Sequence, residues 1–213
     1  KDSEDTGDTF TNRGIQFGAN LAKEKHQHQL YASHDWGNGY RYNTVYENNK
    51  IYYQGNFQFD DNNSLIASYG YVKNGFGANG FYAAPGDKNS KEVVETTLVT
   101  LQAKNKLTDR WSIAPRFSYR YNFDDYRYFK NDLSKARSLH YSNSVSGEIN
   151  STYQLSKGQI GIGAEYRNEQ ITSTSIKNHT RDNVGFYAEY KTDITTKLNV
   201  NIGTYVNYNS QYG

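Results

Sequence analysis

The sequence predicts an all-β fold, an antiparallel transmembrane β-barrel of which about ten strands are present. Three observations support this fold class. Segments of alternating polarity recur along the chain, and very short turns alternate with longer polar loops between them. The mean hydropathy is low at −0.94, yet the chain contains 21 Tyr and 10 Phe. Because disordered chains are poor in aromatic residues, the low hydropathy does not indicate disorder.

The alternation is clearest in residues 111–121. The odd-numbered positions there are mostly aromatic or aliphatic, and the even-numbered positions are small or basic. Successive side chains of a strand point to opposite faces of a sheet. In a soluble sandwich the apolar face would need a second apolar sheet to cover it. In an outer-membrane barrel the apolar face contacts lipid and the polar face lines the lumen.

Composition excludes several other classes. The chain has no apolar run of the length that a transmembrane helix needs, so only barrel strands could span a bilayer. The net charge is +2, with Lys and Arg scattered among acidic residues, which argues against nucleic-acid binding. There is no cysteine, so disulfide bonds contribute nothing. The predicted location is the outer membrane of a Gram-negative cell.

The first two hairpins are expected in residues 14–36 and 50–72. In the first, Ile15, Phe17 and Leu21 alternate with polar residues, and the chain turns at 23–26 before it returns through 27–36. In the second, strands at 50–59 and 64–72 flank the run Asp-Asp-Asn-Asn at 60–63. Asp and Asn favour tight turns, because they tolerate left-handed backbone and bond to nearby amides.

Three more hairpins are expected after residue 91. Their strands are predicted at 92–104 with 110–122, at 142–154 with 159–171, and at 183–192 with 197–208. The long connections are 37–49, 73–91, 123–141 and 172–182. Short turns of outer-membrane barrels are periplasmic and long loops are extracellular, so the loops around Gly77, Tyr128 and His179 are expected outside the cell. Aromatic residues near strand ends, such as Trp36 and Trp111, fit interfacial girdles.

Two segments carry a family resemblance. The first is Phe-Gly-Ala-Asn-Gly-Phe-Tyr-Ala-Ala-Pro at 76–85 with Glu-Val-Val-Glu-Thr at 92–96. The second is Gly-Ala-Glu-Tyr-Arg-Asn-Glu at 163–169, followed by Ser-Thr-Ser at 173–175 and Asn-His-Thr-Arg at 178–181. Their order and spacing resemble the barrel of TonB-dependent outer-membrane transporters of the cobalamin-receptor-like group of Bacteroidetes. The resemblance spans roughly residues 12 to 212.

The resemblance implies a 22-stranded barrel with a plugged lumen. It further implies energy-coupled import of a scarce nutrient, a corrinoid or a metal chelate, with no cofactor of its own. The implied partners are outer-membrane lipid, the nutrient ligand, a surface lipoprotein and the TonB energy-coupling complex, which would act through a plug domain. No plug domain, closing strand or coupling motif is visible. We therefore expect a polar stretch at 1–11 and a segment of a larger barrel at 12–213.

The Gly-rich loop at 75–86 supplies the first candidate ligand contacts. Ligand sites combine aromatic walls with a few polar groups, and Phe76, Asn79, Phe81 and Tyr82 offer both. The loop is not a phosphate cradle, because no helix follows it. The competing interpretation is a loop that packs on its neighbours without touching a ligand.

A second group of candidates lies within the predicted strands. Arg116, Arg120, Glu165 and Arg167 fall at polar positions of the alternation, so a barrel directs them into the lumen. There they would line a substrate path or pair with a plug domain. The alternative is that each charge is simply solvated.

Metal binding has one weak candidate. Asp124 and Asp125 fall in a predicted external loop, and calcium prefers several carboxylate and carbonyl oxygens. Asp60 and Asp61 are attributed to turn chemistry instead. Among the histidines only His26 and His28 are close in sequence, and a transition metal would need further ligands.

Catalysis has no strong signature, and the chain is not expected to be an enzyme. There is no G-x-S-x-G elbow. A small outer-membrane barrel enzyme would have to use His140 with Asp124 or Asp125 and with Ser142 or Ser144. Two further alternatives stay open, a passive porin without a plug and a soluble lipocalin-like or sandwich protein.

Overall fold

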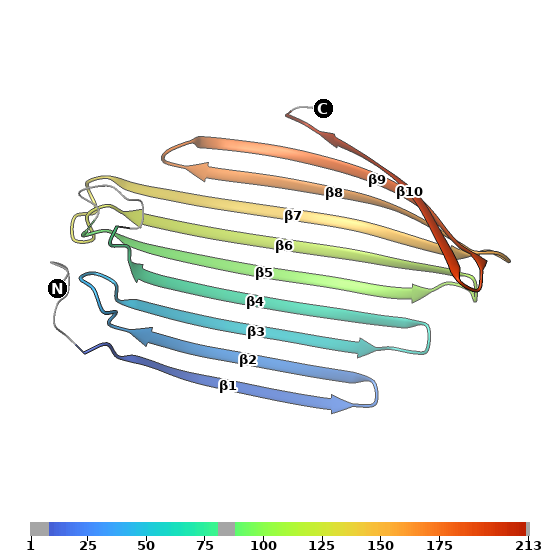
Figure 1. Cartoon of the computed structure of the whole chain (residues 1–213), viewed down its shortest axis with the longest axis horizontal. Coiled ribbons are helices and arrows are strands. Elements are labelled where there is room, and N and C mark those ends of the chain that lie inside the picture. The colour runs from blue at the N-terminus through green and yellow to red at the C-terminus, as the bar shows by residue number, and fades with distance from the viewer. Residues whose placement is uncertain (1–8, 81–87, 212–213) are drawn as a thin grey trace.

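The computed structural model describes residues 9–80 and 88–211 (Figure 1). In these ranges the chain forms one ten-stranded antiparallel sheet. The strands are β1 (Asn12–Lys23), β2 (His26–Gly37), β3 (Tyr46–Gln58), β4 (Asn63–Gly77), β5 (Lys91–Lys106), β6 (Trp111–Arg127), β7 (Arg137–Gln154), β8 (Gln159–Ser173), β9 (Lys177–Thr195) and β10 (Leu198–Asn209). The predicted all-β antiparallel class and the five hairpins are confirmed.

The strands follow one another in the sheet in chain order, so each pairs with its neighbours in sequence. Figure 1 shows the short turns of all five hairpins at one end of the sheet and the connections between hairpins toward the other. We call these the short-turn end and the long-loop end. The sheet is curved, and β9 and β10 swing across it at the short-turn end. Among the described residues no helix is long and apolar enough to cross a membrane.

The pairing register separates two faces of the sheet, because directly opposed residues share a face. Leu101 pairs with Phe117, and Phe117 with Gly147, whereas Gln102 pairs with Arg116 and Arg116 with Glu148. Followed from strand to strand, the first row belongs to a face rich in aliphatic and aromatic residues, which we call the apolar face. The second belongs to a face rich in amides, hydroxyls and charges, which we call the polar face.

The apolar face is not covered by protein. Phe17 is 56% exposed, Phe117 42% and Ile202 69%. In the described part of the chain the only buried hydrophobic residue is Ala78. A soluble sandwich or lipocalin would bury these side chains in a core, so this single curved layer argues against that alternative. An uncovered apolar face opposite a polar one is the arrangement of a barrel wall in lipid.

The strands extend further at the long-loop end than the polarity pattern predicts. Residues 123–127 continue β6, and the connection between β8 and β9 is only residues 174–176. The expectation of external loops at 123–141 and 172–182 is therefore wrong in extent, and His179 lies on β9. Both faces carry polar residues here, as expected of barrel strands that continue beyond a membrane, where no apolar side is needed. The alternation that marks a strand is lost although the backbone pairing continues.

The turn between β3 and β4 has the predicted chemistry. The Asp60 carboxylate accepts hydrogen bonds from the Asn62 amide at 2.8 Å and from Asn63 Nδ2 at 2.9 Å. The Asn63 side chain and the Asn62 amide hold the pKa of the Asp60 carboxyl below its usual value. In the β7–β8 turn Gly158 adopts φ +85°, and a Cβ there would lie 2.4 Å from the Lys191 carbonyl oxygen. Only glycine fits both conditions.

Candidate functional site: the polar face of β6 to β10

The first part of the site is a chain of hydrogen bonds across β6, β7 and β9. Arg116 Nη2 lies 2.6 Å from Glu148 Oε2, and Asn150 Nδ2 donates to Glu148 Oε1 at 2.8 Å. The Tyr187 hydroxyl donates to Asn150 Oδ1 at 2.7 Å. The guanidinium is 48% exposed, so this ion pair is solvated on one side. It orders the side chains more than it stabilises the fold.

The second part joins β8 to β10 across β9. The Tyr205 hydroxyl donates to Glu165 Oε1 at 2.6 Å. The intervening strand presents Gly185, and a Cβ there would lie 2.6 Å from the Tyr205 oxygen and 2.8 Å from Glu165 Oε1. The missing side chain therefore lets residues of two non-adjacent strands meet on the polar face.

The third part surrounds Glu169 on β8. Arg181 Nε donates to Glu169 Oε2 at 2.7 Å, and Arg167 Nε approaches Oε1 at 3.8 Å. Asn183 Nδ2 also contacts Oε2 at 3.3 Å. By register Arg120 lies in the same row as Ser144, Glu169 and Arg181. Two guanidiniums thus lie beside one carboxylate, and Arg120 lies in the same row two strands away.

A cavity of about 390 Å³ opens beside this cluster. Its lining includes Arg120, Ser142, Ser144, Glu169, His179 and Arg181. Within the described residues Arg120 makes no hydrogen bond or ion pair, so its charge is available to a ligand. The lining contains two guanidiniums and one carboxylate, and the carboxylate pairs with Arg181. The hollow therefore suits a ligand with negative charge and hydrogen-bonding groups.

The candidate ligand contacts of the Gly-rich loop lie at the long-loop end, where loops pack on one another. Asn79 Nδ2 donates to the Tyr42 carbonyl at 2.7 Å, and Asn43 Nδ2 donates to the Ser90 carbonyl at 2.6 Å. Lys130 Nζ donates to Asn43 Oδ1 at 2.9 Å, so three loops are tied together at the long-loop end. Asn79 thus has the packing contact that the competing interpretation described. A ligand contact by this loop stays a prediction.

Of the other three loop candidates, one lies on a strand and two lie outside the described residues. Phe76 lies on the polar face near the end of β4, where it pairs with Glu92. Phe81 and Tyr82 lie outside the described residues. Of the predicted set, the structure brings Arg120 and Arg167 to the same cluster and places Arg116 and Glu165 farther down the same face.

Asp124 and Asp125 do not form the predicted external-loop pair, because both lie on β6. As consecutive strand residues they point to opposite faces and cannot converge on one cation. Asp125 is 1% exposed and lies between Arg127 Nε and Arg137 Nε, each at 2.8 Å. No group of three or more His, Cys, Asp or Glu residues that could hold a metal occurs in the described chain. The geometry gives calcium no ligand set here.

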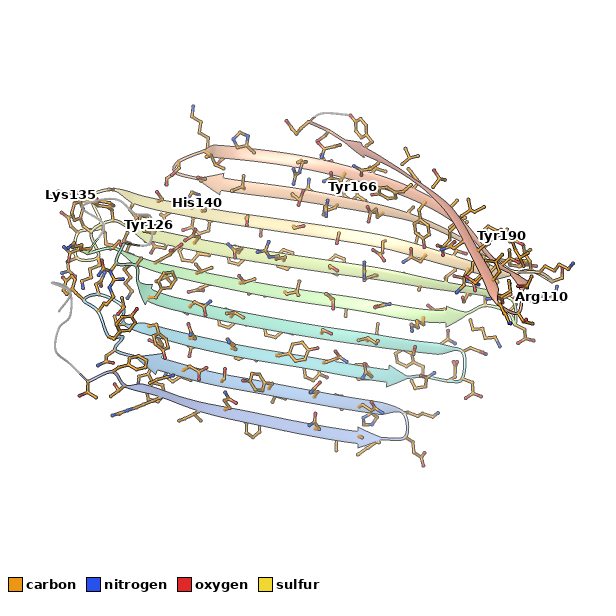
Figure 2. All side chains as sticks on the ribbon, viewed as in Figure 1. Arg110, Tyr126, Lys135, His140, Tyr166 and Tyr190 are labelled. Carbon is orange, nitrogen blue, oxygen red and sulfur yellow. The ribbon has the colours of Figure 1, made fainter. Side chains whose placement is uncertain are left out.

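The register places Asp124 opposite His140, and Ser142 lies two residues along the same face, but in the described chain no hydrogen bond links these three side chains. His140 Nδ1 lies 2.8 Å from Ser173 Oγ instead. Ser173 Oγ also accepts the amides of Ser175 and Ile176 at 3.0 and 3.1 Å, which makes it a cap of the β8–β9 turn. Figure 2 shows His140 toward the long-loop end of β7. The contact of His140 with Ser173 is therefore part of the structure around the β8–β9 turn.

Several residues of the site were not identified from the sequence. Glu148 and Glu169 occupy polar positions of predicted strands. Each lies two residues from another polar residue, Asn150 or Arg167, and this spacing would have placed both on the lumen face. Arg181 was assigned to a loop, which concealed its face. Tyr187 and Tyr205 are aromatic, so their place on the polar face follows only from the register.

Comparison with known proteins supports the fold. No family model matches the sequence, and no curated protein matches it. The siderophore receptor PirA from Pseudomonas aeruginosa is similar in structure, with a TM-score of 0.70 at 12% identity over 96% of this chain and 34% of that one. The open form of the ferric-catecholate import receptor Fiu from E. coli K12 has a TM-score of 0.72 at 11% identity over 97% and 45%.

The unliganded ferric citrate transporter FecA gives a TM-score of 0.68 at 12% identity over 94% of this chain and 35% of that one. This chain thus spans between about a third and under half of these proteins. At such identities the likeness concerns the fold, and it confirms the predicted partial β-barrel. The neighbours named here bear the names of siderophore and ferric-chelate receptors and not of a cobalamin receptor, so the predicted subgroup has no support from them.

Proposed function

We propose that this chain is part of the barrel of a TonB-dependent receptor of the outer membrane, which imports a metal chelate by energy-coupled transport. The observation that carries the proposal is the hollow on the polar face, which is lined by Arg120 and Arg181 and by the single carboxylate of Glu169. The barrel fold and the uncovered apolar face support a place in the outer membrane. The names of the structural neighbours support nutrient import.

The charge of the hollow favours a metal chelate over a corrinoid. An anionic chelate gains from the two guanidiniums, and carboxylate or catecholate oxygens accept hydrogen bonds from them. Arg181 is already paired with Glu169, but a neutral corrinoid would leave the Arg120 charge uncompensated when it displaces water. The substrate class we assign is therefore an anionic ferric or similar chelate.

Three surfaces of the sheet would meet the other parts of the transport system. In a plugged barrel, the hydrogen-bonded side chains around Arg116 and Glu165 would lie where the wall contacts a plug domain. The plug would transmit the action of the TonB complex. Outer-membrane lipid would cover the apolar face. A surface lipoprotein would meet the long-loop end, where Asn43, Asn79 and Lys130 tie the loops together.

Uptake by the full-length protein in a Gram-negative host separates this proposal from a porin. Radiolabelled ferric citrate and ferric catecholates are supplied to cells with the TonB complex intact or deleted. Saturable uptake that disappears with the deletion is expected, because the plug must be moved by that complex. Uptake that rises linearly with concentration in both strains would identify a passive pore and contradict the proposal.

Binding by purified full-length protein tests the hollow itself. Arg120→Glu should weaken binding of the transported chelate at least about tenfold, roughly 1.4 kcal/mol. The matched control is Arg110→Glu, the same change in the turn at the opposite end of the sheet (Figure 2), which should alter affinity less than about twofold. Equal losses in both variants would show a general charge effect and not a ligand site.

A further inference from the structure

Three basic residues form a row on the apolar face at the long-loop end. Lys91 on β5 pairs with Arg127 on β6, and Arg127 pairs with Arg137 on β7. The three side chains therefore occupy one face in adjacent strands. This is the face opposite the hollow, so the proposed transport function makes no use of them.

Asp125 fixes the geometry of the two guanidiniums. Arg127 Nε and Arg137 Nε each donate to its carboxylate at 2.8 Å, and Arg137 Nη2 donates at 3.0 Å. The carboxylate is 2% exposed, whereas the arginine side chains keep 25% and 31%. Each guanidinium has five N–H donors and shares only part of them with Asp125. The remaining donors stay at the surface in a fixed orientation.

The row carries more positive charge than the acid neutralises. Three cations stand against one carboxylate. In the described chain Lys91 makes no hydrogen bond or ion pair, and Nη1 of each arginine is likewise without a partner. Elsewhere at this end of the apolar face no second row of adjacent cations occurs among the described residues: Arg13 on β1 pairs in register with Trp36 and stands alone. Lys73 pairs with Glu95 at 2.7 Å, and β8 opposes β9 there through Thr172 and Asn178.

The height of the row relative to the aromatic residues points to lipid headgroups. The rings of Phe123 and Tyr141 lie 4.9 Å apart on the same face, and aromatic belts of membrane proteins sit at the interface. Arg127 is four residues beyond Phe123 on β6, roughly 13 Å along the strand. The usual tilt of barrel strands brings this to about 10 Å along the membrane normal. The headgroup region extends roughly 5 to 7 Å beyond the hydrocarbon core on each side, and the long side chains of the row can reach back to it.

We propose that Lys91, Arg127 and Arg137 form a binding site for the phosphate groups of a phosphorylated glycolipid in the outer leaflet. Guanidinium groups bind phosphate through paired N–H donors, and Lys91 adds a point charge beside them. The inference rests on the outer-membrane placement in the proposed function and is independent of the chelate. Asp125 is a positioning residue that holds the arginines without touching the lipid.

Native mass spectrometry of the full-length protein in detergent tests this site. The probes are a bisphosphorylated lipid A, the same lipid after removal of both phosphates, and inorganic phosphate. The native protein should retain the phosphorylated lipid at least tenfold more strongly than the dephosphorylated one. The variant K91Q/R137Q should lose at least tenfold in affinity for the phosphorylated lipid, and K91Q alone severalfold.

The controls keep the test decisive. Arg13→Gln removes a cation from the same face near the long-loop end of β1 and should change retention less than twofold. K91Q leaves Asp125 and both of its partners intact, so it reports on the site even where K91Q/R137Q folds poorly. Unchanged retention in K91Q, equal retention of the dephosphorylated lipid, or equally tight binding of inorganic phosphate overturns the lipid site. Chelate uptake and membrane fractionation, measured in parallel, show separately whether the proposed function has failed.

Discussion

The polar face has two halves that differ in chemistry. On β6 to β10 it carries ion pairs, including Arg116 with Glu148 and Arg181 with Glu169. On β1 to β4 it is mostly uncharged. There the Tyr52 hydroxyl donates to Gln54 Oε1 at 2.6 Å, and Gln54 Nε2 contacts Asn56 Oδ1 at 3.3 Å. Both halves belong to one antiparallel sheet, so the difference between them comes from their amino-acid composition and not from the backbone.

Under the proposed function, the difference predicts which part of the wall recognises a ligand. Amide and hydroxyl side chains hydrogen-bond to one another along the strand. They form a neutral polar surface that does not select a ligand by its charge. Charged side chains select by sign and geometry, because guanidinium and carboxylate groups bond most strongly to ionic partners. The hollow lies in the charged half. We therefore expect ligand recognition on β6 to β10 and expect β1 to β4 to be general lining.

The largest predicted contrast comes from removing one cation from each half. Arg181→Gln should weaken binding of the transported chelate about tenfold, near 1.4 kcal/mol, because Arg181 lines the hollow. Lys50→Gln removes a charge from the polar face of β3 and should change affinity less than about twofold. Fluorescence titration of the purified full-length variants measures both. Comparable losses would remove the distinction between the halves.

The two faces of the sheet were predictable, whereas the partners within a face were not. A period of two in side-chain direction suffices to place Arg116 and Arg120 on the polar face, and the register confirms both. The pairing of Arg116 with Glu148 depends on the offset between two strands, which the pattern of either strand alone does not contain. Lipid-facing alternation also ends before the strands do. For that reason Asp125 and Arg181 were assigned to loops.

An intermediate contrast comes from two glycines of the polar face. Gly185→Ala should destabilise the barrel by about 1 kcal/mol, because the new Cβ would lie 2.6 Å from the Tyr205 oxygen and would break its bond to Glu165. Gly18→Ala on β1 has no atom within 4 Å of the new Cβ and should be neutral or slightly stabilising. Thermal unfolding of the full-length protein in detergent, followed by heat-dependent gel migration, compares them. A larger loss in Gly18→Ala would reverse the expected order.

The smallest contrast concerns salt. Glu148→Gln should lower the unfolding free energy by less than about 1 kcal/mol, because the Arg116 side chain is 48% exposed and solvent screens the pair. The loss should shrink further between about 0.1 M and 1 M salt, where the screening length falls from roughly 10 Å to 3 Å. Asn56→Ala in the uncharged half removes a neutral contact, so its effect should not depend on salt. Unfolding of both variants at the two salt concentrations measures the contrast, and an equal salt dependence would mean that charge is not what distinguishes the halves.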